Sequence, residues 1–232
     1  MKSVAIITAR GGSKRISRKN IKEFCGKPII SYSISAAISS NIFDEVMVST
    51  DDSEIAEIGI KYGAKVPFFR SAVTSDDHST TSDVLKEVLL KYSDIGQNFD
   101  YFCCIYPTAP FITAARLKSA VDILVSSKAD SLLPVVRFSF PPQRGLVINQ
   151  DRINFKWSEN MNTRSQDLEP FYHDCGQFYI MKVDRFLEEH RLITENTVPL
   201  IMPEIEVQDI DTLEDWDIAE MKYKLLIQRG DF

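Results

Sequence analysis

The chain has 232 residues, of which 44% are apolar and 26% charged, and its formal net charge is -6. This size and composition fit one large globular domain, or one domain with a sizeable insertion, and they argue against disorder. The mild acidity argues against a nucleic-acid-binding protein, because the binding domain of such a protein is usually basic.

The sequence shows no sign of a membrane or secreted protein. It lacks the long apolar stretch of a signal peptide at its start, and it has no run of about 18 apolar residues that could span a bilayer. We therefore expect a soluble cytoplasmic protein that does not act at a membrane. Its cysteines form no CxxC pair and have no His at zinc-ligand spacing, so we expect reduced thiols at Cys25, Cys103, Cys104 and Cys175.

Short β-rich runs alternate with segments of helical periodicity along the first half of the chain. The expected strands are residues 3–8, 45–50, 66–69, 99–107 and 131–136, and the expected helices are 27–40, 53–63, 79–92 and 114–127. This alternation predicts an α/β fold with a doubly wound, mostly parallel sheet flanked by helices. Gly63 is expected to end the second helix, and Thr113 to cap the start of the fourth.

Ligands on such sheets bind at the carboxyl ends of the strands. Polar residues follow several of the expected strands, at 49–51, at Arg70 and at 106–110. We expect these residues to converge on one rim of the sheet.

The alternation breaks between about residues 137 and 170, where a Pro pair, short alternating runs and several aromatic side chains occur. We interpret this stretch as an insert in a single domain, 1–232, rather than as a second domain. Its aromatic residues form the core of a small sheet or, alternatively, a dimer contact: Phe138, Phe140, Phe155 and Trp157. After the insert, residues 178–181 are expected to resume the sheet and 212–228 to form a closing amphipathic helix.

A basic segment, TARGGSKRISRKN, occupies residues 8–20 directly after the first strand. Its adjacent glycines let backbone N–H groups approach an anion, and the surrounding cations suit a triphosphate. It contains neither GxxxxGK[ST] nor GxGxxG, the two common phosphate motifs, so a solvated basic turn remains the alternative. Arg18 and Lys22 have no role in this interpretation and are expected to be exposed to solvent.

An acidic pair, Asp209 and Asp211, follows the run EIEV, which is expected to be extended. Residues i and i+2 of an extended chain project to the same side. Two carboxylates on one side could hold Mg²⁺, which also takes waters and substrate phosphates as ligands. Alternatively, Asp211 and Glu214 form a capping box, which needs no metal, and the two interpretations are compatible.

A third polar cluster lies in NTRSQDLEPFYHDCGQFY, residues 162–179. His173 in this cluster is either a structural hydrogen-bonding residue or a catalytic base. Gly176 precedes the expected strand at 178–181 and marks either a tight turn or a close approach of the backbone to a ligand.

Taken together, these segments resemble the cytidylyltransferases that make CMP-linked nine-carbon acidic sugars. The match begins with ARGGSKR and KNI and continues in family order through VSTDDSEIAEIGIKYGAKVPFFR, YPTAPF, NTRSQDL, YHDCGQFY and EVQDIDTLEDWDIAEMKY. It covers nearly the whole chain. The resemblance implies a Rossmann-like nucleotidyltransferase fold, CTP and a nine-carbon acidic sugar as substrates, Mg²⁺ as cofactor, and a homodimer formed through the insert.

The resemblance also implies roles for individual residues. It places the nucleotide against Arg10, Gly11, Gly12, Ser13, Lys14, Arg15, Lys19, Asn20, Arg70, Ser79, Thr80 and Thr81. It places the sugar against Tyr106, Arg164, Gln166, His173 and Asp174. The catalytic residues that it implies are Lys19, Arg10, Asp209 and Asp211, and the two aspartates are also the implied metal ligands.

Tyr106 and Ile112 stand where sialate enzymes of this family typically have Gln and Arg. This departure favours a nine-carbon acid that is substituted differently from sialate. The segments NTRSQDL, YHDCGQFY and VQDIDTLED resemble those of the pseudaminate enzymes of the family, which implies pseudaminate as the sugar, with N-acylneuraminate or legionaminate as alternatives. The expected reaction is attack of the sugar's anomeric hydroxyl on the α-phosphorus of CTP, a step that depends on positioning and charge neutralisation. A non-enzymatic nucleic-acid-binding module is the remaining alternative, and its affinity would fall steeply with salt.

Overall fold

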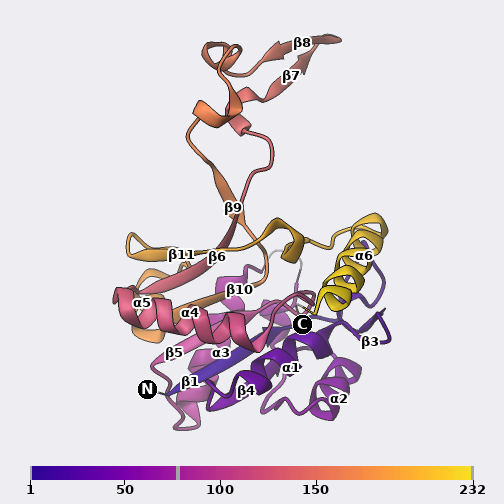
Figure 1. The fold of residues 1–232 in the computed structure, drawn as a ribbon. Helices are drawn as coiled ribbons and strands as arrows, with labels where there is room; N and C mark the ends of the chain where they lie inside the picture. Colours follow the sequence, from indigo (N-terminus) through magenta and orange to yellow (C-terminus); the bar gives the residue numbers. More distant parts are fainter. Residues whose placement is uncertain (1, 77–78, 231–232) are drawn as a thin grey trace.

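A mixed sheet lies at the centre of the fold in the computed structural model, which describes residues 2–76 and 79–230 (Figure 1). Within these residues the sheet has seven strands, in the order β11-β6-β10-β5-β1-β4, with β9 paired to β6. The strands are β1 (Ser3–Thr8), β4 (Glu45–Ser49), β5 (Tyr101–Ile105), β6 (Ser131–Arg137), β9 (Tyr172–Asp174), β10 (Phe178–Lys182) and β11 (Thr197–Ile201). β9 and β10 run antiparallel to their neighbours, whereas the other pairs are parallel.

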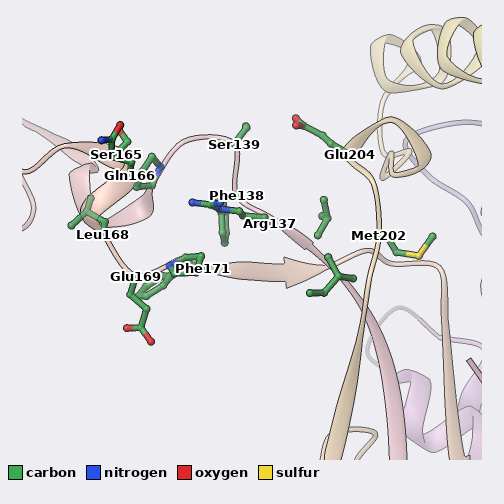
Figure 2. Close-up of a pocket in the computed structure, with 14 residues that line it drawn as sticks. Arg137, Phe138, Ser139, Ser165, Gln166, Leu168, Glu169, Phe171, Met202 and Glu204 are labelled. Atoms are coloured by element: carbon green, nitrogen blue, oxygen red, sulfur yellow. The ribbon is translucent and has the colours of Figure 1, made fainter. Parts of the chain in front are cut away.

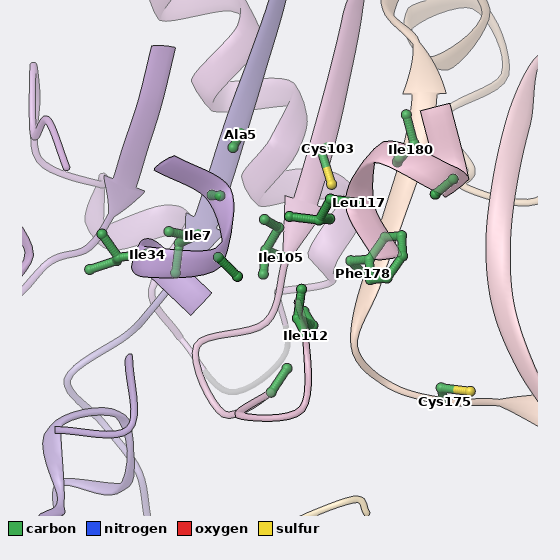
Figure 3. Packing of buried hydrophobic residues seen from close by; sticks show 14 of the residues in the cluster. Ala5, Ile7, Ile34, Cys103, Ile105, Ile112, Leu117, Cys175, Phe178 and Ile180 are labelled. Carbon is green, nitrogen blue, oxygen red and sulfur yellow. The ribbon is translucent and has the colours of Figure 1, made fainter. Parts of the chain in front are cut away.

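Helices cover both faces of this sheet, which confirms the predicted doubly wound α/β fold. They are α1 (Ile30–Ser40), α2 (Ser53–Lys61), α3 (Thr81–Asp94), α4 (Ala114–Ser127), α5 (Val183–Glu189) and α6 (Leu213–Arg229). Ala5 and Ile7 of β1 pack in one core with α1, α2 and α4, part of which Figure 3 shows. Val4 and Ile6 pack in a second core with α3 and α5. A strand that is buried on both faces must be apolar throughout, which is why its sequence is a continuous apolar run.

The predicted helix ends agree closely with the structure. The Thr113 side chain accepts a hydrogen bond from the backbone N–H of Arg116 and so caps α4. Gly63 lies one residue beyond Tyr62, the C-cap of α2, with a φ of 94°, a left-handed conformation that glycine adopts at low cost.

Residues 66–69 do not form the predicted strand. An isolated parallel bridge joins Lys65 to Met47 of β4, after which the chain leaves the sheet. The run contains Pro67, which lacks an amide N–H for pairing, and Phe69 is 52% exposed. This segment therefore has the apolar composition of a strand but lacks the backbone hydrogen bonds of one.

A third core lies under α6, beside the start of the basic segment. It joins Trp216 of α6 to Phe24 of the small β2 (Glu23–Phe24) and β3 (Lys27–Pro28) pair, with ring centroids 5.6 Å apart. Lys22 lies over the Trp216 ring at 5.1 Å from its centroid, so the prediction that Lys22 is simply exposed was wrong. This packing carries the end of the chain back to the amino-terminal loop.

Residues 138–171, here named the arm, project away from the sheet (Figure 1). β6 and β9 form its base, and the hairpin of β7 (Leu146–Asn149) and β8 (Arg152–Phe155) forms its far end. The exposed fractions of Phe138, Phe140 and Trp157 are 39%, 60% and 43%. The prediction that the aromatic rings form the core of a small sheet was therefore wrong for these three, because no second layer of this chain covers the hairpin among the described residues. Phe155, in β8, is half-buried.

All four cysteines are free thiols, as predicted, and Cys103, Cys104 and Cys175 are buried. Burial raises the pKa of the Cys104 thiol to about 12, which keeps it protonated and unreactive at neutral pH. Within residues 2–76 and 79–230, no helix has the length and apolar character needed to cross a membrane. The cytoplasmic location stays a prediction.

Candidate active site

The carboxyl ends of β1, β4, β5 and β6 meet at one edge of the sheet, because these strands run in the same direction. A cleft of about 460 Å³ opens at this edge, and we name it the main cleft. Thr8, at the end of β1, and Tyr106, directly after β5, line it together with the basic segment. The predicted rim is therefore present.

Most of the residues predicted to bind the nucleotide line this cleft: Arg10, Ser13, Lys14, Arg15, Lys19, Asn20, Arg70, Ser79 and Thr81. Gly11, Gly12 and Thr80 do not. The N–H of Gly11 donates to Asp51 at 2.9 Å, and Thr80 caps α3 in a capping box with Asp83. Thr74 and Asp76 also line the cleft, although the sequence analysis did not assign them to it, and Thr108 belongs to the segment 106–110 that was expected at this rim.

The basic loop, defined as residues 10–20, closes on itself at the mouth of the cleft. The Asn20 side chain donates to the carbonyl oxygen of Arg10 at 2.8 Å, which links the two ends of the loop. Asn20 is buried, whereas the Arg15 side chain is 68% exposed. The loop therefore has a fixed base and solvent-accessible cations.

Asp211 lies against this loop. Its carboxylate is 2.6 Å from Nη1 of Arg15 and 3.6 Å from Nζ of Lys19. Nζ of Lys19 also donates to the carbonyl oxygen of Ile210 at 2.7 Å. The acidic segment that precedes α6 therefore neutralises part of the charge of the basic loop in the free protein.

The local structure around the acidic pair differs from the prediction in two ways. The run EIEV contains the 3₁₀ helix Glu204–Glu206 and is not an extended strand. The capping box at the start of α6 pairs Thr212 with Asp215, and not Asp211 with Glu214. The hydrogen bonds from Thr212 lower the pKa of the Asp215 carboxyl. Because Asp215 makes the capping contacts, Asp211 is left to face the basic loop.

Asp209 does not line the main cleft. It is exposed and lines a smaller cleft of about 210 Å³, here named the small cleft, with His173 and Lys222. The Nδ1 atom of His173 lies 2.9 Å from the carbonyl oxygen of Asp174, and its ring packs on Phe138 at the base of the arm. The acidic pair thus divides between two neighbouring sites.

Arg70 is a buried cation at the edge of the main cleft. Its Nη2 donates to the carbonyl oxygen of Ser49 at 2.7 Å, and burial lowers the pKa of its guanidinium group. Arg70 thus reaches the rim through the loop that follows α2, although the strand predicted to carry it is absent.

Tyr106 connects the main cleft to the base of the arm. Its hydroxyl lies 3.2 Å from that of Thr81, and its ring packs edge-to-face on Tyr179 with centroids 5.7 Å apart. The Tyr179 hydroxyl donates to the Asp174 carboxylate, which also accepts from the N–H of Gly176. Gly176 has a φ of 61° and makes a turn. The Asp174 carboxylate therefore has structural partners.

Two residues predicted to contact the sugar lie on the arm. Arg164 pairs with Asp167 at 2.7 Å. Gln166 lines a groove of about 440 Å³, here named the arm groove, between the arm and the body. Figure 2 shows this groove, with Phe138 and Leu168 on the arm and Met202 on the body. Neither Arg164 nor Gln166 lines the main cleft, so their sugar contact stays a prediction.

The structure adds Arg18 and Asp52 to the site region. Arg18 forms ion pairs with Asp52 and Glu54, so the prediction that it is exposed without a role was wrong. The signal in the sequence was the segment STDD directly after β4, which places acidic residues at the same sheet edge as the basic loop.

Comparison with known proteins yields related chains along nearly the whole length. A family model described as Cytidylyltransferase matches residues 4–196. Pseudaminic acid cytidylyltransferase of Campylobacter jejuni is 41% identical over 226 residues, covering 97% of this chain and 97% of that protein. CMP-N,N'-diacetyllegionaminic acid synthase of Legionella pneumophila is 34% identical, again with 97% of each chain covered. A solved structure of CMP:2-keto-3-deoxy-manno-octonic acid synthetase complexed with CTP has the same fold, with a TM-score of 0.70, 19% identity, and coverage of 99% of this chain and 100% of that chain.

Proposed function

The chain belongs to the cytidylyltransferase family, and from this premise we propose that it converts CTP and pseudaminate to CMP-pseudaminate and pyrophosphate. The observation that carries the proposal is the main cleft at the carboxyl edge of the sheet, lined by the cations of the basic loop. The choice of sugar is supported by the 41% identity to a pseudaminic acid cytidylyltransferase. The related proteins thus support the reaction class, and the main cleft is a site that could bind the triphosphate.

In the proposed reaction, the oxygen of the sugar's anomeric hydroxyl forms a bond to the α-phosphorus of CTP. The bond between that phosphorus and the bridging oxygen of the β-phosphate breaks, and pyrophosphate leaves with the electron pair. The hydroxyl proton passes to a base. Such a transfer requires aligned reactants and neutralised phosphate charge more than a side-chain nucleophile.

The basic loop is proposed to supply that neutralisation. Arg10, Lys14 and Arg15 line the main cleft and would hold the triphosphate, and Lys19 would contact the α-phosphate. The Lys19 side chain is 20% exposed and is held by the carbonyl oxygen of Ile210. A cation that is positioned before the substrate arrives loses little entropy during the reaction, which favours this role for Lys19.

We further propose that Asp209 and Asp211 hold Mg²⁺. Among residues 2–76 and 79–230, no group of three or more His, Cys, Asp or Glu side chains could hold a metal. Mg²⁺ commonly binds through one or two carboxylates together with substrate phosphates. Here the two carboxylates would reach the ion from neighbouring sites, since Asp209 lines the small cleft and Asp211 faces the basic loop. When bound, the ion would neutralise triphosphate charge. In the free protein, Arg15 and Lys19 neutralise Asp211 instead.

His173 is the proposed candidate for the base. The carbonyl oxygen of Asp174 can only accept, so Nδ1 of neutral His173 donates to it and Nε2 is left to accept a proton. His173 shares the small cleft with Asp209. A His173→Ala protein whose pH–rate profile keeps the wild-type shape would exclude His173 as the essential base.

The arm is proposed to form a homodimer contact. In the hairpin, Ile148 pairs with Ile153 and Leu146 with Phe155, so one face of the hairpin is apolar. Ile148 and Ile153 are 73% and 65% exposed. An isolated two-stranded hairpin is at best marginally stable in water, so this face needs a cover. The arm of a second copy of the chain has the same exposed apolar face, so the two arms could cover each other in a symmetric contact.

The experiment that tests the function is incubation of the purified protein with CTP, Mg²⁺ and one nine-carbon acid at a time, with pyrophosphate release as the readout. Pseudaminate, legionaminate and N-acylneuraminate form the panel. We expect turnover with pseudaminate at a kcat/KM at least tenfold above that of either other acid. Preferred turnover of another acid would overturn the substrate assignment and leave the reaction class intact.

The legionaminate reaction is the second candidate, because a CMP-N,N'-diacetyllegionaminic acid synthase is 34% identical over nearly the whole chain. The same panel separates it from the first. Failure with every acid, combined with nucleic-acid binding that weakens steeply between low and physiological salt, would instead support a nucleic-acid-binding module.

A further inference from the structure

Two consecutive acidic residues after β4 hold the two ends of the basic loop. At the start of the loop, the N–H of Gly11 donates to the Asp51 carboxylate at 2.9 Å. Near its end, the guanidinium group of Arg18 forms two parallel hydrogen bonds to the Asp52 carboxylate, at 2.5 and 2.9 Å. The same guanidinium group also forms an ion pair with Glu54. The loop is therefore attached at both ends to the edge of the sheet.

Asp52 is itself fixed in position. It is the N-cap of α2, and its Oδ1 accepts from the backbone N–H of Ile55 at 3.0 Å. Its carboxylate also lies against Gly11, where an added Cβ would stand 2.8 Å from Oδ2. Because a helix start and a strand end hold Asp52, its carboxylate provides a rigid anchor for the loop.

Arg18 has a conformation that needs such an anchor. Its φ is 53°, in the left-handed region that few residues other than glycine adopt. It is the N-cap of the 3₁₀ helix Lys19–Ile21, and no side-chain hydrogen bond caps that helix. Lys19 and Asn20, the next two residues, line the main cleft, whereas Arg18 does not. The direction in which Lys19 points thus depends on how Arg18 is held.

We propose that Arg18 and Asp52 form a positioning clamp, which holds the basic loop in its triphosphate-binding shape before the nucleotide arrives. This inference rests on the proposed function. Arg18 and Asp52 are positioning residues, since neither lines the main cleft, and they act through Lys19 and the backbone of the loop.

The clamp lowers the free-energy cost of binding CTP. The cations of the loop repel one another, and in a free loop the cost of bringing them together would be added to the cost of binding CTP. Bidentate pairing of arginine with a carboxylate fixes orientation as well as distance. The hydrogen bonds from Arg18 lower the pKa of the Asp52 carboxyl to about 2, so the pair stays ionised at every pH at which the enzyme would work.

Asp52→Asn is the decisive variant. Asparagine caps a helix about as well as aspartate and has nearly the same shape, so α2 and the contact with Gly11 are retained while the charge is lost. Arg18→Met removes the fork, and Arg18→Lys keeps the charge without the fork. Lys22→Met is the matched control, because Lys22 is a neighbouring cation that contacts Trp216 and not the clamp.

The expected result is a rise of roughly tenfold in the KM and Kd for CTP in Asp52→Asn and Arg18→Met, with the KM for the sugar unchanged. Arg18→Lys should recover part of this loss, and Lys22→Met should behave as the wild type. In the ligand-free Asp52→Asn protein, trypsin should cleave after Lys14 and Arg15 several times faster than in the wild type, and saturating CTP should restore protection.

Wild-type KM and Kd for CTP in both variants, or wild-type trypsin resistance in Asp52→Asn, would overturn the clamp. A fall in Tm without any change in the KM for CTP would also overturn it, since it would reduce the pair to a structural role. If the wild-type protein does not turn over CTP, the proposed function fails. The rate of trypsin cleavage in the ligand-free proteins then still tests the clamp alone.

Discussion

Lys19 illustrates how neighbouring residues share the charge of the site. Its Nζ interacts with a backbone carbonyl group and lies 3.6 Å from the Asp211 carboxylate, beside the Arg15 guanidinium group. A phosphate that enters the main cleft would compete with Asp211 for both cations. At the scale of single residues, Lys19 and Arg15 are therefore paired with Asp211 in the ligand-free protein, and a bound phosphate would break these ion pairs.

Lys19→Ala should lower kcat by at least two orders of magnitude while the free energy of unfolding changes by less than about 1 kcal/mol. A partly exposed ion pair contributes little to stability, whereas a positioned cation at a developing charge contributes much to the rate. Pyrophosphate release and urea denaturation measure the two quantities. Near-normal turnover would remove Lys19 from the catalytic set.

Asp209→Ala tests the proposed metal site. Asp209 is exposed, so its loss should leave the free energy of unfolding unchanged while turnover falls by orders of magnitude and the Mg²⁺ concentration needed for half-maximal rate rises. The assay is pyrophosphate release across a Mg²⁺ titration. Wild-type turnover with an unshifted titration curve would remove Asp209 from the proposed metal ligands.

The Asp52 carboxyl gives a pH dependence of stability. Its pKa is lowered from an ordinary 3.8 to about 2 by the hydrogen bonds from Arg18, so the folded state favours the ionised form. The stabilisation is complete above about pH 4 and is lost as the pH falls toward 2. Urea unfolding between pH 2 and 6 should show a smaller loss at low pH in Asp52→Asn than in the wild type. Parallel curves would contradict this expectation.

At the scale of elements, α6 decides what the acidic segment can do. Its capping box joins the side chains of Thr212 and Asp215 to each other's backbone N–H groups. Three residues separate Asp211 from Glu214, the predicted pair, and likewise Thr212 from Asp215, the pair observed. The register of the first helical turn selected the second, because Trp216 and Ala219 must face the core under α6.

Thr212→Ala should therefore destabilise the protein by about 1 kcal/mol, as the loss of an N-cap usually does. Glu214→Ala is the matched control and should change the free energy of unfolding by less than half of that, since Glu214 is exposed and outside the box. Urea denaturation of the three proteins provides the measurement. An equal loss in both variants would contradict the observed capping register.

At the scale of the whole molecule, the arm projects from the same edge of the sheet at which the main cleft opens. β6 and β5 run in the same direction, so the arm begins where the polar rim lies. The contact from Tyr106 through Tyr179 to Asp174 joins the two. A partner that covers the arm would therefore lie close to the substrate site.

Replacing both Ile148 and Ile153 with Glu should convert the proposed dimer to a monomer. Two buried charges on the apolar face of the hairpin would cost more than the contact gains. Sedimentation velocity measures the mass, and Leu90→Glu, on the exposed surface of α3, is the control for an added charge. A wild-type protein that sediments as a monomer would contradict the proposed dimer.

Local patterns in the sequence predicted most of the fold. The apolar run of β1, the periodicity of α4 and the cap at Thr113 were all recognisable, because each depends on residues close together in the chain. The segment at 66–69 had the composition of a strand but not the pairing, and only the structure could show that the chain leaves β4 after the single bridge at Lys65. The interpretation of the aromatic rings of the arm as a buried core was wrong for a similar reason, because burial requires a second layer of the structure that no local pattern reveals.

The sequence by itself determined the basic loop, the order of the family segments and the residues that could meet at the carboxyl edge of the sheet. The tertiary structure alone decided which charges meet. Arg15 and Asp211 are 196 residues apart in the chain, and Arg18 and Asp52 are 34 apart. Such pairings follow from the path of the backbone between them, which is fixed by burial of the three cores and not by any local pattern.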